Sequence, residues 1–101
     1  MVGRTWKNTY RLSDAQLDQL DKAELLMESM DLGQAEELLV SMLEDDPNCI
    51  PVLSNLGHLY GRHLSEFEKA VDYYGQVLEI EPDNAWARDE RRRYQRYLTY
   101  D

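Results

Sequence analysis

The chain of 101 residues has one cysteine, three prolines, five glycines and no long apolar run. A lone cysteine, Cys49, excludes an intramolecular disulfide and any metal cluster built on paired thiolates. No apolar stretch approaches the roughly 18 residues that suggest a membrane-spanning helix. The opening residues MVGRTWKNTYRLS contain no apolar segment of the signal-peptide kind. These absences predict a cytoplasmic protein of one domain, without a membrane partner.

Motifs of catalysis and cofactor binding are also absent. The sequence has no Gly-rich phosphate loop, no Gly-x-Ser-x-Gly and no His-Glu-x-x-His. His58 and His63 are five residues apart, so on a regular α-helix they would point about 140° away from each other and could not share a metal ion. Cys49 lies too far away to join both. We therefore expect a protein that is not an enzyme and that holds no cofactor or metal.

Basic residues are scarce along most of the chain. Residues 14–84 hold 17 acidic and 3 basic side chains, a balance of −14, whereas the segments before and after carry +3 and +2. An acidic body argues against contacts with nucleic-acid phosphates and would steer basic partners toward it. The C-terminal RDERRRYQRYLTY mixes arginine with tyrosine, which keeps nucleic-acid binding as a weaker alternative. The other interpretation is a capping helix whose arginines interact favourably with its own C-terminal dipole and with the acidic residues of the repeats.

Apolar residues recur at helical spacing in the first half of the chain. Ser13 and Gln16 form a capping-box pattern at the start of a helix expected over residues 14–30. Gly33 is expected in the turn that closes this helix, and Asp31 is expected to cap the next one, which Pro47 stops. The polar leader, residues 1–13, carries two isolated aromatic side chains, which we expect to pack on the first helix or to contact a partner: Trp6 and Tyr10.

Residues 50–84 carry the most regular pattern, made of Leu53, Leu56, Gly57, Tyr60, Ala70, Tyr74, Val77 and Pro82. This pattern resembles the tetratricopeptide repeat, a helix–turn–helix unit of about 34 residues with the consensus W-x2-L-G-x2-Y…A-x3-F…P. Leucine replaces the tryptophan, tyrosine replaces the phenylalanine, and one residue is inserted in the turn around Leu64. The glycine is expected to let a neighbouring helix approach closely. Within this unit Ser65 and Glu68 suggest a second capping box.

Residues 16–49 match the same pattern in their second half. Four residues of this stretch stand at the offsets seen in residues 50–84: Ala35, Leu39, Met42 and Pro47. The first half departs from it, because Lys22 and Ala23 stand where leucine and glycine are expected. The resemblance implies an all-α fold, a short α-solenoid of about five helices, in one domain over residues 14–101.

The expected order is repeat one over 16–49, repeat two over 50–84 and a capping helix over 85–99. Asn84 is expected to cap this last helix at its N-terminus. Ala87, Tyr94 and Leu98 are expected to face the repeats, with the arginines outside, as the end of a solenoid requires.

The resemblance also implies a concave surface lined by the first helix of each pair. In this family the lining comes from the second, fifth, ninth, twelfth and thirteenth residues of each repeat. With Asn55 beside them and three residues of the capping helix, the corresponding positions are Leu17, Leu20, Glu24, Met27, Glu28, Pro51, Ser54, Asn55, His58, Gly61, Arg62, Trp86, Asp89 and Arg93. The three apolar residues from the first helix are explained equally well as core residues.

One subtype of the family grips acidic chaperone tails with a clamp of lysine, asparagine and arginine. Asn55 matches the clamp, but Leu20 and Glu24 stand at the expected lysine and asparagine of the first unit. Trp86 and Glu90 occupy the positions of the third unit. An acidic-tail ligand is therefore not expected.

The resemblance implies a non-enzymatic adaptor, scaffold or co-chaperone-like module that binds a peptide or helix of another protein, with basic character favoured by the acidic body. Fold alone does not fix function. The main alternative is self-assembly, because two repeats fall below the roughly three needed for a stable array. The groove or an exposed end would then be buried in a homodimer. Whether the chain is a piece of a longer array stays open.

Overall fold

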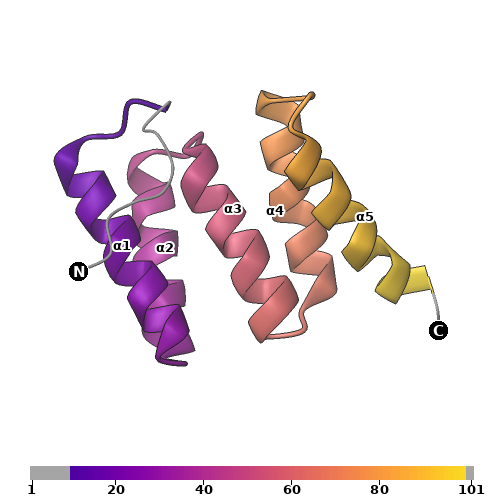
Figure 1. The fold of residues 1–101 in the computed structure, drawn as a ribbon, viewed down its shortest axis with the longest axis horizontal. Helices are drawn as coiled ribbons and strands as arrows, with labels where there is room; N and C mark the ends of the chain where they lie inside the picture. The colour runs from indigo at the N-terminus through magenta and orange to yellow at the C-terminus, as the bar shows by residue number, and fades with distance from the viewer. Residues whose placement is uncertain (1–9, 100–101) are drawn as a thin grey trace.

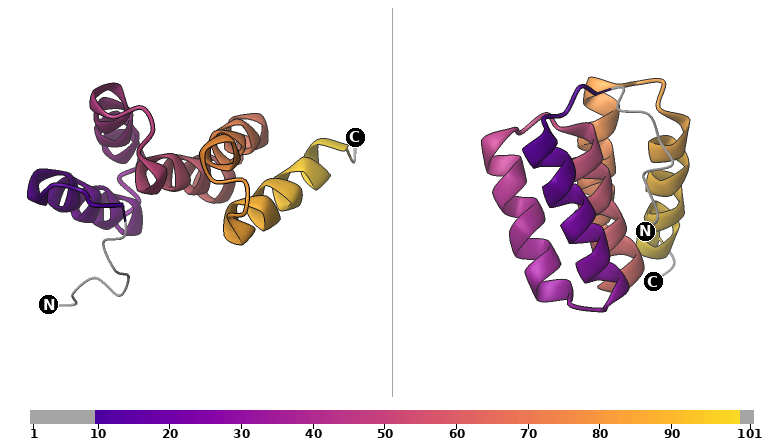
Figure 2. Two further views of the ribbon diagram at one scale, coloured as in Figure 1. Left: turned by 90° about the horizontal axis from the view of Figure 1, so that it is seen from above. Right: turned by 60° about the vertical axis from the view of Figure 1, so that its left-hand side comes forward.

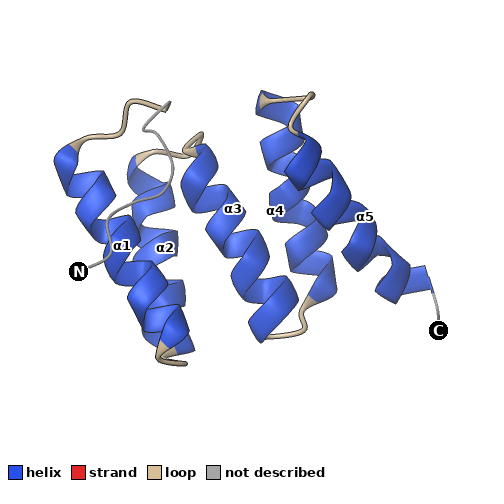
Figure 3. Cartoon of the chain, in the orientation of Figure 1, coloured by secondary structure: helices blue, strands red, loops and turns tan. Residues whose placement is uncertain are grey.

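A computed structural model describes residues 10–99, and within this range all regular secondary structure is helical (Figures 1 and 3). The elements are α1 (Asp14–Glu28), α2 (Leu32–Asp45), α3 (Ile50–His58), the π-helical turn η1 (Leu59–His63), α4 (Phe67–Ile80) and α5 (Ala85–Thr99). The predicted all-α fold with five helices is confirmed. None of these helices is both long enough and apolar enough to cross a membrane. Trp6 and most of the predicted leader lie outside the described residues.

The helices follow one another in two rows. Seen from above, α1, α3 and α5 lie in one row and α2 and α4 in the other (Figure 2, left). Each helix packs mainly against its neighbour in sequence, and the junction between α2 and α3 is the sparsest of the four. As a result α1 and α5 lie at opposite ends of the molecule (Figure 1).

The start of α1 confirms the predicted capping box. The backbone N–H of Gln16 donates to Ser13 Oγ (3.1 Å), and the backbone N–H of Ser13 donates to Gln16 Oε1 (2.9 Å). The predicted turn at Gly33 is wrong, because Gly33 lies inside α2 and the chain reverses at Met30, whose φ is 62°. Asp31 stands at the N-cap of α2, but its carboxylate accepts a hydrogen bond from Gln34 Nε2 (2.9 Å) and none from the backbone.

Of the caps predicted for α4 and α5, one is absent and one is present. The predicted capping box of Ser65 and Glu68 is wrong, because Ser65 turns the chain at φ 55° and Glu66 occupies the N-cap position without a side-chain hydrogen bond. The predicted cap of α5 is confirmed, since Asn84 Oδ1 accepts from the backbone N–H of Ala87 (2.9 Å). The hydroxyl of Tyr10, a residue expected to pack on the first helix or to contact a partner, donates to Glu81 Oε1 (3.1 Å) at the end of α4.

The core contains the residues at matching offsets in the two helix pairs. All six are at most 4% exposed: Ala35, Leu39 and Met42 on α2, and Ala70, Tyr74 and Val77 on α4. On α5, Ala87 and Tyr94 are buried as predicted, but Leu98 is 36% exposed. The ring of Tyr97 stacks on Phe67 instead, with centroids 4.6 Å apart, so tyrosine and not leucine covers the start of α4.

Immediately before Leu64, where the sequence pattern suggested an extra residue, the helix makes the π-helical turn η1. The backbone N–H of Leu64 donates to the carbonyl oxygen of Leu59, five residues back (3.0 Å). A π-turn inside a helix holds one residue more than an α-turn. The π-turn thus adds one residue to the helix itself, whereas the sequence pattern suggested an extra residue in the turn that follows the helix.

Two tyrosine rings lie directly on the backbone of this helix. A Cβ added to Gly57 would lie 2.8 Å from the ring of Tyr74, and one added to Gly61 would lie 2.5 Å from the ring of Tyr94. Tyr74 comes from α4 and Tyr94 from α5, and both rings are buried. The predicted close approach at Gly57 is confirmed, and Gly61 provides a second one.

Replacing either glycine should therefore destabilise the fold. We expect Gly57→Ala and Gly61→Ala each to lower the free energy of unfolding by about 1–3 kcal/mol, because a buried ring has to move to admit the methyl group. The measurement is urea unfolding followed by far-UV circular dichroism.

Gly33→Ala is the matched control. It lies within α2 with no atom within 4 Å of the added Cβ, so it should gain up to about 1 kcal/mol from helix propensity. Equal effects of all three substitutions would contradict the role of the tyrosine contacts.

Candidate protein-binding groove

One concavity of the molecule is formed by α1 and α3, with α5 at one end. It consists of two adjoining hollows of about 330 and 240 Å³ that share Glu24, Asn55 and His58. We call their combined lining the α1–α3 groove: Leu20, Glu24, Met27, Glu28, Pro51, Ser54, Asn55, His58, His63 and Trp86. Most of the lining residues that the sequence suggested are thus brought together in one groove.

The floor and the walls of the groove differ in polarity. Leu20 and Met27 belong to the buried core, at 1% and 5% exposure, and reach the groove only as its apolar floor. Glu24 and Glu28, which are exposed, form an acidic rim on α1. On α3 the Nδ2 of Asn55 donates to the carbonyl oxygen of Pro51 (2.9 Å), so its Oδ1 is left to accept a further hydrogen bond. A ligand here meets apolar surface flanked by hydrogen-bond acceptors.

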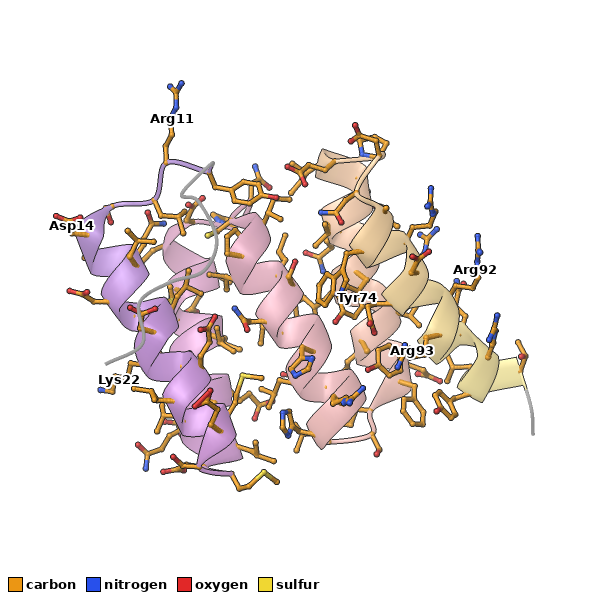
Figure 4. The ribbon with its side chains drawn as sticks, in the orientation of Figure 1. Arg11, Asp14, Lys22, Tyr74, Arg92 and Arg93 are labelled. Carbon is orange, nitrogen blue, oxygen red and sulfur yellow. The ribbon has the colours of Figure 1, made fainter. Side chains whose placement is uncertain are left out.

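Trp86 closes one end of the groove and is held by the core. Its side chain is 49% exposed, and its ring meets that of Tyr74 edge to face at 5.4 Å. Tyr74 lies between α3 and α5 (Figure 4), and its hydroxyl is buried without a hydrogen-bond partner among residues 10–99. Burial, with the nearby carboxylate of Glu90, raises the pKa of Tyr74 above its usual range. The groove therefore offers a large aromatic surface whose position is fixed by a buried ring.

The remaining predicted residues lie elsewhere. Leu17 is 8% exposed and lines neither hollow, so the core interpretation holds for it. Gly61, Arg62 and Arg93 line a separate hollow of about 240 Å³ with Ser65, Phe67, Tyr94 and Tyr97. Asp89 and Arg93 line another, of about 380 Å³, with Arg92, Arg96 and Tyr97. What the sequence suggested as one surface is thus divided into an acidic-rimmed groove and a basic aromatic end.

The two histidines lie together, which corrects the expectation that they point apart. Their ring centroids are 5.3 Å apart at an interplanar angle of 76°. The π-turn produces this contact, because it makes residues five apart neighbours on the helix surface. His63 therefore belongs to the groove, and α-helical geometry missed it. The one available signal was the inserted residue. In residues 10–99 no group of three or more histidine, cysteine, aspartate or glutamate side chains is placed to hold a metal ion.

Compared with models of known protein families the chain matches none, and a comparison with curated proteins finds no match either.

The histidine contact should be visible in titration. Burial, His63 and the guanidinium of Arg62 lower the pKa of His58 below its ordinary value, outweighing Glu90, which acts in the opposite direction. We expect the imidazole signals of His58 to titrate below about 6.5. His63→Gln should move this pKa upward because it removes the second of these causes. An NMR titration of both proteins is the measurement, and a His58 pKa above the ordinary value would contradict the arrangement.

The same shift has a consequence for stability. Because folded His58 binds a proton less readily than unfolded His58, its contribution to the free energy of unfolding is intact above about pH 6.5. It falls as the pH drops from there toward the folded pKa. His58→Gln should remove this part of the pH dependence. Urea unfolding of both proteins at several pH values between about 5.5 and 7.5 tests it.

Proposed function

We propose that the α1–α3 groove binds a segment of another protein, an extended peptide or a helix with basic side chains, and that the protein acts in the cytoplasm as an adaptor or scaffold without catalysis or cofactor. The observation that carries this proposal is the apolar floor of Leu20 and Met27 between the acidic rim of Glu24 and Glu28 and the aromatic wall of Trp86.

The chemistry of the groove favours a basic partner over an acidic one. The rim carboxylates attract lysine or arginine side chains, and the surrounding charge of −14 raises the rate of their encounter. The exposed indole of Trp86 can receive a cation on its face or an apolar side chain against its ring. Phosphate groups of a nucleic acid would be repelled by the same rim.

The tetratricopeptide resemblance is part of this proposal and is supported by the burial pattern. The residues at matching offsets of α2 and α4 are buried alike, and α1 packs on α2 and α3 on α4, with α5 packed on α4 in turn. Ala23, at the position where the family has glycine, is fully buried. The division into two repeats and the capping role of α5 belong to the same resemblance. The step from that resemblance to an adaptor is an analogy, because fold alone does not fix function.

The experiment begins with a display library of random peptides selected on the immobilised protein. We expect selected peptides to combine basic and apolar residues, and to shift the backbone amide signals of Glu24, Ser54, Asn55, His58 and Trp86 in NMR spectra. The variant Glu24→Lys/Glu28→Lys should weaken their binding at least about tenfold, or ~1.4 kcal/mol, because the rim changes sign.

The matched control is Glu68→Lys/Glu79→Lys, which makes the same change of charge at exposed positions of α4. It should keep the affinity within about threefold if the rim, and not the total charge, attracts the peptide. Peptides whose signals map to another face, or equal losses in both variants, would refute the groove as the binding site.

A further inference from the structure

The outer face of α5 carries a row of exposed arginines. Arg88, Arg92 and Arg96 are spaced four residues apart, and all three are exposed. Within residues 10–99 the ion pairs of α5 are local ones: Arg88 with Asp89 (3.7 Å) and Arg93 with Glu90 (3.8 Å). Arg92 points away from the rest of the molecule (Figure 4), and in the described part of the chain neither it nor Arg96 has an ion-pair partner. We call Arg88, Arg92 and Arg96 the α5 stripe. In residues 10–99 none of them forms an ion pair with a carboxylate of the acidic residues 14–84.

The outer face of α2, in the helix pair at the other end of the molecule, has the opposite character. Glu37, Val40 and Glu44 follow one another at spacings of three and four residues, on the side away from the buried Ala35, Leu39 and Met42. Both glutamates are exposed, and Val40 is 37% exposed. In residues 10–99 no cation forms an ion pair with either glutamate. This α2 stripe presents an apolar side chain between two unpaired carboxylates.

The two stripes match in length. At a rise of about 1.5 Å per residue, Glu37 and Glu44 lie ~10.5 Å apart along α2, and Arg88 and Arg96 lie ~12 Å apart along α5. Two helices packed along these stripes would place arginine beside glutamate at both ends of the contact. The contact cannot form within one chain, because α2 belongs to the first helix pair and α5 ends the row (Figure 1).

We propose that the partner for the α5 stripe is a second copy of this chain, bound through its α2 stripe. Symmetric pairing of two α5 stripes, or of two α2 stripes, would oppose like charges. A closed pair would need both α2–α5 contacts to form at once between two copies, whereas the two stripes lie at opposite ends of the molecule (Figure 1). We therefore take the contact to be head to tail, so that each copy that joins leaves a free stripe at both ends of the assembly. Such a contact grows without closing unless the rotation between copies forms a ring.

The acidic face of α4 is a weaker candidate for the same role. Asp72 and Glu79 line a hollow with Arg91 of their own chain, and α4 packs directly against α5 instead of lying at the other end of the molecule. This face provides the control. Neither stripe lines the α1–α3 groove, so the outcome is independent of the function proposed for the groove.

The solution mass of the full chain tests the proposal. Exposed ion pairs are individually weak, so light scattering should cover about 10 µM to about 1 mM protein. At about 20 mM salt, where charges act over roughly 20 Å, we expect the mean mass to rise with concentration from the 11.9 kDa of one chain past twice that value. At about 500 mM salt the mass should return to one chain.

Two neutralising variants identify the faces. Arg92→Gln/Arg96→Gln and Glu37→Gln/Glu44→Gln should each stay at the mass of one chain under the low-salt conditions. In an equal mixture the arginine variant supplies an intact α2 stripe and the glutamate variant an intact α5 stripe. The mean mass of the mixture should therefore rise to that of two chains and no further. The control Asp72→Gln/Glu79→Gln should assemble as the unchanged protein does.

Three results would overturn the proposal. The first is a mass of one chain throughout at low salt. The second is an unchanged protein whose mass saturates at two chains, which would indicate a symmetric dimer. The third is a mixture of the two variants that remains at one chain.

Discussion

The arrangement of the helices depends on two tyrosine rings that lie on bare backbone. Tyr74 of α4 covers Gly57, and Tyr94 of α5 covers Gly61, each closer than any residue with a Cβ would allow. The rings stack on one another with centroids 6.2 Å apart and an angle of 8°. Because both contacts are made to one continuous helix, the positions of α4 and α5 relative to α3 are fixed together.

The groove inherits its shape from these contacts. Trp86 reaches the groove from the first turn of α5, and its ring packs at a steep angle against the ring of Tyr74. If α5 lay farther from α3, the aromatic wall would separate from the polar residues of α3 that face it. The π-turn contributes on the other side, since it places Gly61 under Tyr94 and His63 beside His58 within the same five residues. Packing of the core and composition of the groove thus arise from the same stretch of sequence.

The parts of the structure that follow from local rules could be predicted from the sequence. The spacing of Ala70, Tyr74 and Val77 indicated the buried side of α4, and Ser13 and Asn84 capped their helices as expected. Gly33 and Ser65 were misplaced because the chain reverses at non-glycine residues with positive φ, which a sequence pattern does not reveal. Leu98 was wrongly predicted to face the repeats, because the neighbouring Tyr97 stacks on Phe67 instead. That contact joins residues far apart in the sequence, so local spacing does not reveal it.

Most of the residues that line the groove stand at positions that the tetratricopeptide resemblance suggested. Glu24 and Ser54 precede η1, where the period of 3.6 residues holds, and they line one hollow with Trp86 of α5. His63 follows the change of period at η1, and Arg62 and Arg93 turn toward the aromatic end. The surface that the sequence suggested is thus divided between the groove and the aromatic end.

The serial packing of the helices also bears on how the chain acquires its fold. Each helix contacts mainly its sequence neighbour, so native contacts close short loops and the entropic cost of bringing partners together is small. The sparse junction between α2 and α3 separates an N-terminal hairpin from the aromatic assembly of α3, α4 and α5. The topology therefore divides the chain into two units that are each closed by local contacts, the α1–α2 hairpin and the three C-terminal helices.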